Sequence, residues 1–202
     1  MNLLFASSNK NKIKEISSML PNNIKLYSLD DIGFNREIEE TGKTIEENAE
    51  LKARTVFNYL NNYSATINID GVFADDSGLE VEALNGAPGV FSARYSGEIK
   101  NDNANNQKLL SELKTVTKRH AQFKTVIALV TNNTTNLFEG VIKGTIAYEP
   151  RGKNGFGYDP LFIPQGYRST FAELEAEEKN KISHRAIAVK KLVEHLKTNY
   201  AK

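Results

Sequence analysis

Several short polar clusters in this 202-residue chain have residue types that could carry chemistry. The first follows a short apolar segment and precedes a helical pattern; it consists of Ser7, Ser8, Asn9, Lys10, Asn11 and Lys12. A strand-to-helix junction offers free backbone N–H groups and a positive helix end, which favour an anion. The same residues also fit an ordinary helix N-cap with solvated lysines. The chain has no G-x-x-x-x-G-K-[ST] motif, so this segment is not a Walker loop.

Two pairs of adjacent acids form the next candidates. Glu39 and Glu40 precede Thr41-Gly42, and Asp75 and Asp76 follow the apolar residues 71–74 and precede Ser77-Gly78. Carboxylate oxygens suit a hard cation such as Mg²⁺. The second pair, read as the end of a strand, fits a metal or general-base site. The alternatives are a solvated surface pair and an ordinary turn, because Asp, Ser and Gly are all turn formers.

The remaining clusters lie in the last third of the chain. Glycines flank the aromatic residues of the segment 155–160, where Phe156 could stack on a flat ligand or fill the core. Lys179 is followed by Ser183, His184 and Arg185. If Ser183 caps a helix, the two basic residues occupy its first turn, where cations are unfavourable. A ligand with an anionic or carbonyl group at this helix end would offset that cost.

Composition excludes several classes of chemistry. The chain has no cysteine, so it has neither a thiolate nucleophile nor a disulfide. G-x-S-x-G and H-E-x-x-H motifs are also absent. Lys and Arg number 26 against 25 Asp and Glu, a net charge of +1, which argues against a broad nucleic-acid surface but permits a single nucleotide. The apolar start is too short for a signal peptide, and no apolar run approaches about 18 residues, so we expect a cytoplasmic protein.

The clusters are positioned by alternating strand and helix patterns. Helical stripes are expected over 10–20, from Thr44 onward, over 101–113, and after Ser183. Strands are expected over 2–6, 24–29, 72–74, 79–84, 122–131 and 136–148, the last two joined by a hairpin turn at 132–135. This order predicts one α/β domain over residues 1–202 with an antiparallel component in its sheet.

Taken in order, these segments resemble the Ham1-like family of non-standard purine nucleoside triphosphate pyrophosphatases. The resemblance covers nearly the whole chain and includes A-S-S-N-K-N-K, E-T-G-K-T-I-E-E-N-A, A-D-D-S-G-L, G-A-P-G-V-F-S-A-R-Y, G-F-G-Y-D-P and S-H-R. It implies an elongated mixed central sheet flanked by helices, with two lobes around a nucleotide-binding cleft. It also implies a homodimer and Mg²⁺-dependent hydrolysis of ITP, dITP and XTP to the monophosphate and pyrophosphate.

The resemblance also implies residue roles. Ser7 to Lys12 and Lys52 would bind the triphosphate, Ser77 would contact the substrate, and Glu39 or Glu40 with Asp76 would hold the metal. Asp76 would also accept a proton from water. The purine would be recognised by Phe156, Gly157, Tyr158, Asp159, Lys179, His184 and Arg185. Many members of the family have glycine at the position of Ser8, where glycine permits backbone angles that serine rarely adopts.

Two other functions remain open at this stage. One is a pyrimidine-directed or broad nucleotide pyrophosphatase, and the other is a nucleotide-binding module without catalysis. A module without catalysis would be expected to lack the acidic residues, but Glu39, Glu40, Asp75 and Asp76 are all present. In the purine interpretation, Arg185 and His184 can donate to the 6-keto group of hypoxanthine and xanthine.

Overall fold

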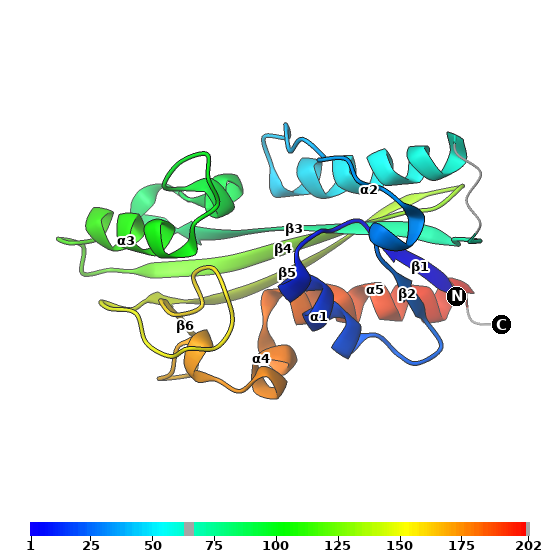
Figure 1. Cartoon of the computed structure of the whole chain (residues 1–202). Coiled ribbons are helices and arrows are strands. Elements are labelled where there is room, and N and C mark those ends of the chain that lie inside the picture. The colour runs from blue at the N-terminus through cyan, green and yellow to red at the C-terminus, as the bar shows by residue number, and fades with distance from the viewer. Residues whose placement is uncertain (63–66, 201–202) are drawn as a thin grey trace. The chain divides into compact units, whose positions relative to one another are not determined.

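The computed structural model describes residues 1–62 and 67–200 (Figure 1). Its six strands form one mixed sheet in the order β2-β1-β3-β4-β5-β6. The chain divides into two compact units: unit 1 contains residues 1–76, 125–140 and 185–202, and unit 2 contains residues 77–124 and 141–184. Within the described part, no helix has the length and apolar character needed to cross a membrane.

Unit 1 is built on three parallel strands. β1 (Asn2–Phe5) pairs with β2 (Lys25–Tyr27) on one side and with the start of β3 (Gly71–Val81) on the other, in the register Leu3↔Gly71 to Phe5↔Phe73. The unit also contains α1 (Lys10–Met19), η1 (Asp30–Ile32), α2 (Ile45–Asn62) and α5 (His184–Tyr200) from its second residue on. Residues 125–130 of β4 (His120–Val130) and residues 135–140 of β5 (Thr135–Ile146) belong to it as well.

The two faces of this sheet carry separate cores, because successive side chains of a strand point to opposite faces. Val72 and Ala74 of β3 pack with the apolar stripe of α2. Phe73, which lies between them, packs with residues of α1 and α5. Figure 1 accordingly places α2 on one side of β1 and β3, and α1 and α5 on the other. The side chains of the next residues in β3 continue to point alternately to the two faces of the sheet.

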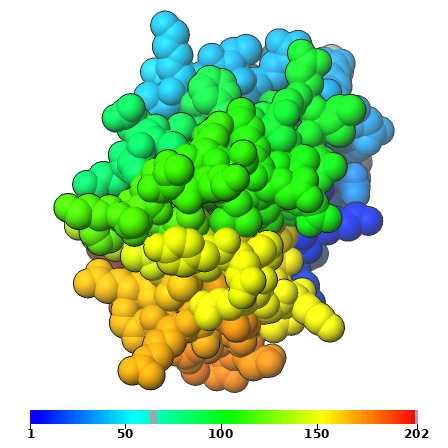
Figure 2. Space-filling view, turned by 90° about the vertical axis from the view of Figure 1, so that its left-hand side faces the viewer, coloured from blue at the N-terminus to red at the C-terminus, as the bar shows by residue number. Residues whose placement is uncertain are grey.

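Unit 2 contains the rest of the sheet. Its regular elements are the end of β3, η2 (Glu82–Leu84), η3 (Gly89–Arg94), α3 (Asp102–Glu112), residues 120–124 of β4, residues 141–146 of β5, β6 (Phe162–Pro164), η4 (Phe171–Glu173) and α4 (Ala176–Ile182). β6 is antiparallel to β5. Leu79, Leu109, Phe123 and Phe162 belong to its core. In Figure 2 the green region of η3 and α3 lies beside the yellow loop before β6.

The structure confirms the mixed α/β sheet and corrects three local predictions. β3 does not end at Ala74 but continues through Asp75, Asp76, Ser77 and Gly78 to Val81, so these residues form no turn. These turn-forming residues do not end the strand, because β3 lies between two other strands of the sheet. β6 and α4 were not predicted; both are short and lack a distinct apolar period. The predicted cleft between two lobes stays a prediction.

Candidate active site

The segment between β1 and α1 is a compact cap. Asn9 is the N-cap of α1, and its side-chain oxygen accepts hydrogen bonds from the backbone N–H groups of Asn11 and Lys12 at 3.0 and 3.2 Å. The Asn9 N–H in turn donates to Ser7 Oγ at 3.2 Å. The N-cap interpretation therefore holds for Asn9. Ser8 and Lys10 lie exposed at the same end of the helix, where a negative charge is favoured.

Lys12 does not point into solvent as the N-cap interpretation expected. Its Nζ lies 3.0 Å from Asp75 Oδ1, and its side chain is only 15% exposed. Burial lowers the pKa of this ammonium, and the neighbouring Asp75 charge opposes that effect. The cap thus presents a cation that is fixed by a carboxylate of β3.

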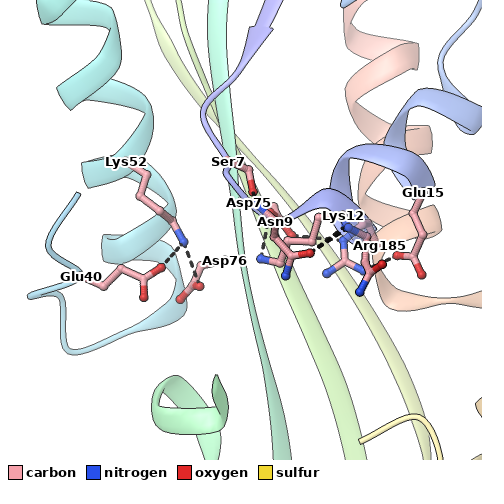
Figure 3. A network of polar contacts seen from close by, with 10 residues as sticks. Ser7, Asn9, Lys12, Glu15, Glu40, Lys52, Asp75, Asp76 and Arg185 are labelled. Atoms are coloured by element: carbon pink, nitrogen blue, oxygen red, sulfur yellow. Dashed lines mark hydrogen bonds and ion pairs between the residues drawn. The ribbon is translucent and has the colours of Figure 1, made fainter. Parts of the chain in front are cut away.

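The two adjacent acids of β3 point to opposite faces of the sheet (Figure 3). Asp75 lies on the side of α1 and α5, and Asp76 on the side of α2, where its Oδ1 is 3.1 Å from Lys52 Nζ. Their pKa values move in opposite directions. Burial raises the pKa of Asp76. Burial also acts on Asp75, but the charges of Lys12 and Arg185 outweigh it and hold its pKa well below the usual range. Of the two, Asp76 is the carboxylate suited to accept a proton.

The start of α2 places Glu40 beside Asp76. Gly42 N–H donates to the buried Asn48 side chain at 2.7 Å, and a Cβ at position 42 would approach that oxygen to 2.6 Å, so glycine is needed there. The loop before it brings Glu40 Oε1 to 2.7 Å from Lys52 Nζ. Although burial lowers the pKa of Lys52, the charges of Asp76 and Glu40 outweigh it and raise the value.

Glu40, and not Glu39, therefore lies with Asp76 around the Lys52 ammonium. Glu39 is exposed in the same loop. Within residues 1–62 and 67–200, no three acidic, histidine or cysteine side chains gather closely enough to form a metal cage. Two carboxylates about one shared ammonium do fit Mg²⁺, which commonly takes one or two protein carboxylates together with substrate phosphates and water.

Arg185 is buried at the start of α5, with 2% of its side chain exposed. Its Nε donates to Asp75 Oδ2 at 3.2 Å and its Nη1 to Glu15 Oε2 at 2.5 Å. The unfavourable position of a cation in the first turn of α5 is thus offset by two carboxylates of the protein. The compensation that the sequence led us to expect from a ligand therefore comes from Asp75 and Glu15.

The predicted purine set of unit 2 is organised by Asp159. Its Oδ2 accepts from Lys179 Nζ at 2.6 Å and from the Phe156 N–H at 2.8 Å. The Lys179 ammonium also lies 5.0 Å from the centre of the Phe156 ring, within the range of a cation–π contact. Asp159 and Lys179 are both buried, so they hold the ring of Phe156 in place from within unit 2.

The other members of this set occupy different surroundings. Tyr158 is buried; its hydroxyl donates to the Ser92 carbonyl at 2.9 Å, and its own carbonyl accepts from the N–H groups of Leu161 and Phe162 at 2.9 and 3.1 Å. The backbone of Gly157 is held from α3, since its N–H donates to Asp102. The His184 ring stacks on Phe123, with centroids 4.6 Å apart and planes 8° apart. Ser77 is half-buried in β3.

A glycine in this loop gives a stability prediction. Gly155 has φ +75°, and a Cβ there would lie 2.0 Å from Asp159 Oδ2. We expect Gly155→Ala to break the Asp159 contacts and to lower Tm, because the Phe156 ring loses its support.

Gly33→Ala is the matched control for that substitution. Gly33 has φ +65° with no atom within 4 Å of the added Cβ, so backbone strain is the only cost. Left-handed strain of about 1–2 kcal/mol corresponds to roughly 2–8 °C in a chain of this size. Gly155→Ala should exceed this loss, and equal losses of Tm in the two variants would contradict the proposed role of Asp159.

Sequence reasoning missed three residues that shape these surroundings. Asp75 was considered only as one half of an acidic pair, because its partners Lys12 and Arg185 become apparent only in the fold. Glu15 could have been noticed, since it lies three residues after Lys12 and so on the same side of α1. Phe123 appeared only as an apolar residue of a strand.

Comparisons with known proteins agree with the resemblance found in the motifs. The sequence matches the Ham1 family over residues 3–195. A dITP/XTP pyrophosphatase of Flavobacterium psychrophilum is 55% identical over 197 residues, which cover 98% of this chain and all of that protein. A dITP/XTP pyrophosphatase of Bacillus subtilis is 49% identical over 193 residues, covering 94% of this chain and 93% of that protein.

Solved structures show the same fold. The Ham1 protein of Staphylococcus aureus has a TM-score of 0.86 and 41% identity, covering 98% of this chain and 99% of that one. A Ham1 protein of Coxiella burnetii has a TM-score of 0.87 with the same identity and coverage. The family match, these sequence identities and this structural agreement extend over nearly the whole chain. This chain therefore belongs to the Ham1 family.

Proposed function

We propose that this chain hydrolyses the non-standard purine nucleoside triphosphates dITP, XTP and ITP to the monophosphate and pyrophosphate. One observation carries the proposal: Asp76 and Glu40 share the Lys52 ammonium on one face of β3, next to the strand-to-helix cap that holds Lys12. Relatives of 45–55% identity bear the name dITP/XTP pyrophosphatase, which supports the same substrates here.

In this proposal the triphosphate is bound by the cap residues and by cationic side chains. Ser7, Ser8, Asn9 and Asn11 supply polar groups, and Lys10, Lys12 and Lys52 neutralise phosphate charge. Asp76 and either Glu40 or Glu39 hold Mg²⁺, and the pairing with Lys52 favours Glu40. An ion held by these carboxylates would supply positive charge to the phosphate oxygens.

Asp76 accepts the proton of the attacking water. Its pKa, raised by burial, makes it a stronger base than an exposed aspartate. The oxygen of water joins the monophosphate, and pyrophosphate leaves with the electron pair of the broken P–O bond. The lysines hold the negative charge that develops on the leaving group.

The family resemblance assigns recognition of the base to the loop 156–159, to Lys179, and to His184 and Arg185. Phe156 offers a ring face, and Gly157, Tyr158 and Asp159 shape the loop behind it. Lys179 supports the loop, and Ser77 contributes a further polar contact. His184 and Arg185 donate towards the 6-keto group, which adenine lacks. Cytoplasmic location, a homodimer and one domain over residues 1–202 remain predictions of the family resemblance.

The test is product analysis with purified protein. We expect dITP and XTP to yield monophosphate and pyrophosphate in the presence of Mg²⁺, and EDTA to abolish turnover. Release of orthophosphate in place of pyrophosphate would refute the proposed reaction. Binding of dITP without turnover in Mg²⁺ would instead favour the non-catalytic nucleotide-binding module.

A further inference from the structure

Asp75 joins two cations that the proposed function uses for different parts of the substrate. Its Oδ1 lies 3.0 Å from Lys12 Nζ, and its Oδ2 lies 3.2 Å from Arg185 Nε. The Asp75 side chain has no exposed surface, and that of Arg185 is 2% exposed. Lys12 comes from α1 and Arg185 from α5, so one carboxylate of β3 connects two helices (Figure 3).

The ion pairs around Asp75 contain equal numbers of positive and negative charges. Asp75 and Glu15 face Lys12 and Arg185, which gives two negative and two positive charges in a region largely closed to water. Buried ions are tolerated when they are paired and hydrogen-bonded, and removing one member leaves its partner uncompensated. Glu15 contacts Arg185, whereas Asp75 contacts both cations and is the group that they share.

The alternation of β3 separates this role from catalysis. Asp76 points towards α2, where it meets Lys52, while Asp75 points towards α1 and α5. Both carboxylate oxygens of Asp75 contact these two cations, one Lys12 and the other Arg185. Its contacts act instead on the positions of the Lys12 and Arg185 side chains.

Resting on the proposed function, we propose that Asp75 is a positioning residue that fixes Lys12 for the triphosphate and Arg185 for the base, and so couples the two kinds of recognition. Both side chains are long and lose their preferred geometry when the shared carboxylate is replaced. A single substitution at Asp75 therefore weakens phosphate binding and base discrimination together. Loss of Lys12 alone weakens the first, and loss of Arg185 alone weakens the second.

The test uses two measurements that do not depend on the fraction of correctly folded enzyme. One is the ratio of kcat/KM for dITP over dATP, and the other is the Ki of inorganic tripolyphosphate as a competitive inhibitor. In Asp75→Asn we expect the ratio to fall and the Ki to rise, each by about tenfold or more, because misplacement of a binding group by about 1 Å can cost up to 100-fold. Asp75→Glu keeps the charge and should recover part of both effects.

The control is Asp70→Asn, which removes an exposed carboxylate just before the same strand and should leave both values at those of the wild-type protein. If Asp75→Asn does not fold, Asp75→Glu carries the test, since its longer side chain should shift both values in the same directions. A change in one value alone, no change in either, or no inhibition of the wild-type protein by tripolyphosphate would overturn the inference. Failure of the wild-type protein to hydrolyse dITP would instead refute the proposed function.

Discussion

Asp76→Asn is expected to lower kcat for dITP by about 10²–10⁴-fold, because the variant loses the proton acceptor and the charge of one of the two carboxylates proposed to hold Mg²⁺. Asn keeps the size and polarity of the side chain but has no negative charge at neutral pH. The measurement is single-turnover hydrolysis of dITP, which reports the chemical step separately from product release. A near-wild-type rate would remove Asp76 from catalysis.

The same variant should not be less stable than the wild-type protein. Burial raises the pKa of Asp76 in the folded state. A carboxyl group with a higher pKa in the folded than in the unfolded protein lowers stability as the pH rises through these values. Removing its charge is therefore expected to maintain or raise Tm at pH 7 in EDTA. Asp30→Asn, at an exposed site in η1, is the control for both measurements and should change neither.

Lys52→Met is expected to have the second largest effect. Lys52 Nζ lies 2.7 Å from Glu40 and 3.1 Å from Asp76, and only 10% of its side chain is exposed. Without the ammonium, two carboxylates face one another with no countercharge, so stability falls. Activity should fall by about 10²-fold or more, as for the loss of a preorganised donor to developing charge.

Mg²⁺ distinguishes this explanation from a simple packing defect. The ammonium of Lys52 repels a divalent cation from the two carboxylates, and methionine does not. The rise in Tm on adding Mg²⁺ should therefore be larger in Lys52→Met than in the wild-type protein, because an ion that binds the folded state stabilises it by mass action. Lys190→Met, on the exposed side of α5, is the control. An equal rise in Lys52→Met and wild type would contradict the placement of the metal.

Local patterns predicted much of the fold. The apolar residues Ala49, Ala53 and Val56 recur at helical spacing, and they form the face of α2 that packs on the sheet. Thr44 and Glu47 predicted the start of that helix. Thr44 Oγ1 does accept from the Glu47 N–H at 3.1 Å, although the Glu47 carboxylate reaches back to Lys43 and not to Thr44. These features depend on residues close together in sequence.

What the sequence did not predict depends on contacts between distant segments. Asp75 to Gly78 have turn-forming side chains, yet pairing with neighbouring strands keeps them in β3. Arg185 lies 110 residues from Asp75 and 170 from Glu15, so no local pattern predicts that these carboxylates neutralise it. The alternation of β3 also separates Asp75 from Asp76, a distinction that follows only once the strand is known to continue.

The candidate site was predicted mainly by the order of its motifs. The resemblance named Asp76, Lys52 and Glu40 together, and the fold brings these three side chains into contact. It could not choose between Glu39 and Glu40, because adjacent residues of a loop have no fixed direction in sequence. The choice depends on the hydrogen bond from Gly42 to Asn48, which sets the path of the loop.

The most direct measurement compares kcat/KM for dITP, XTP and ITP with the values for dATP, GTP and dUTP, at equal Mg²⁺ and with detection of pyrophosphate. The proposed site predicts efficient release of pyrophosphate from the three non-standard purine nucleotides. It predicts a value lower by at least about tenfold for dATP, because adenine lacks the 6-keto group, and this is within the discrimination that binding groups provide. Comparable values for dATP, or a preference for dUTP, would contradict the assignment.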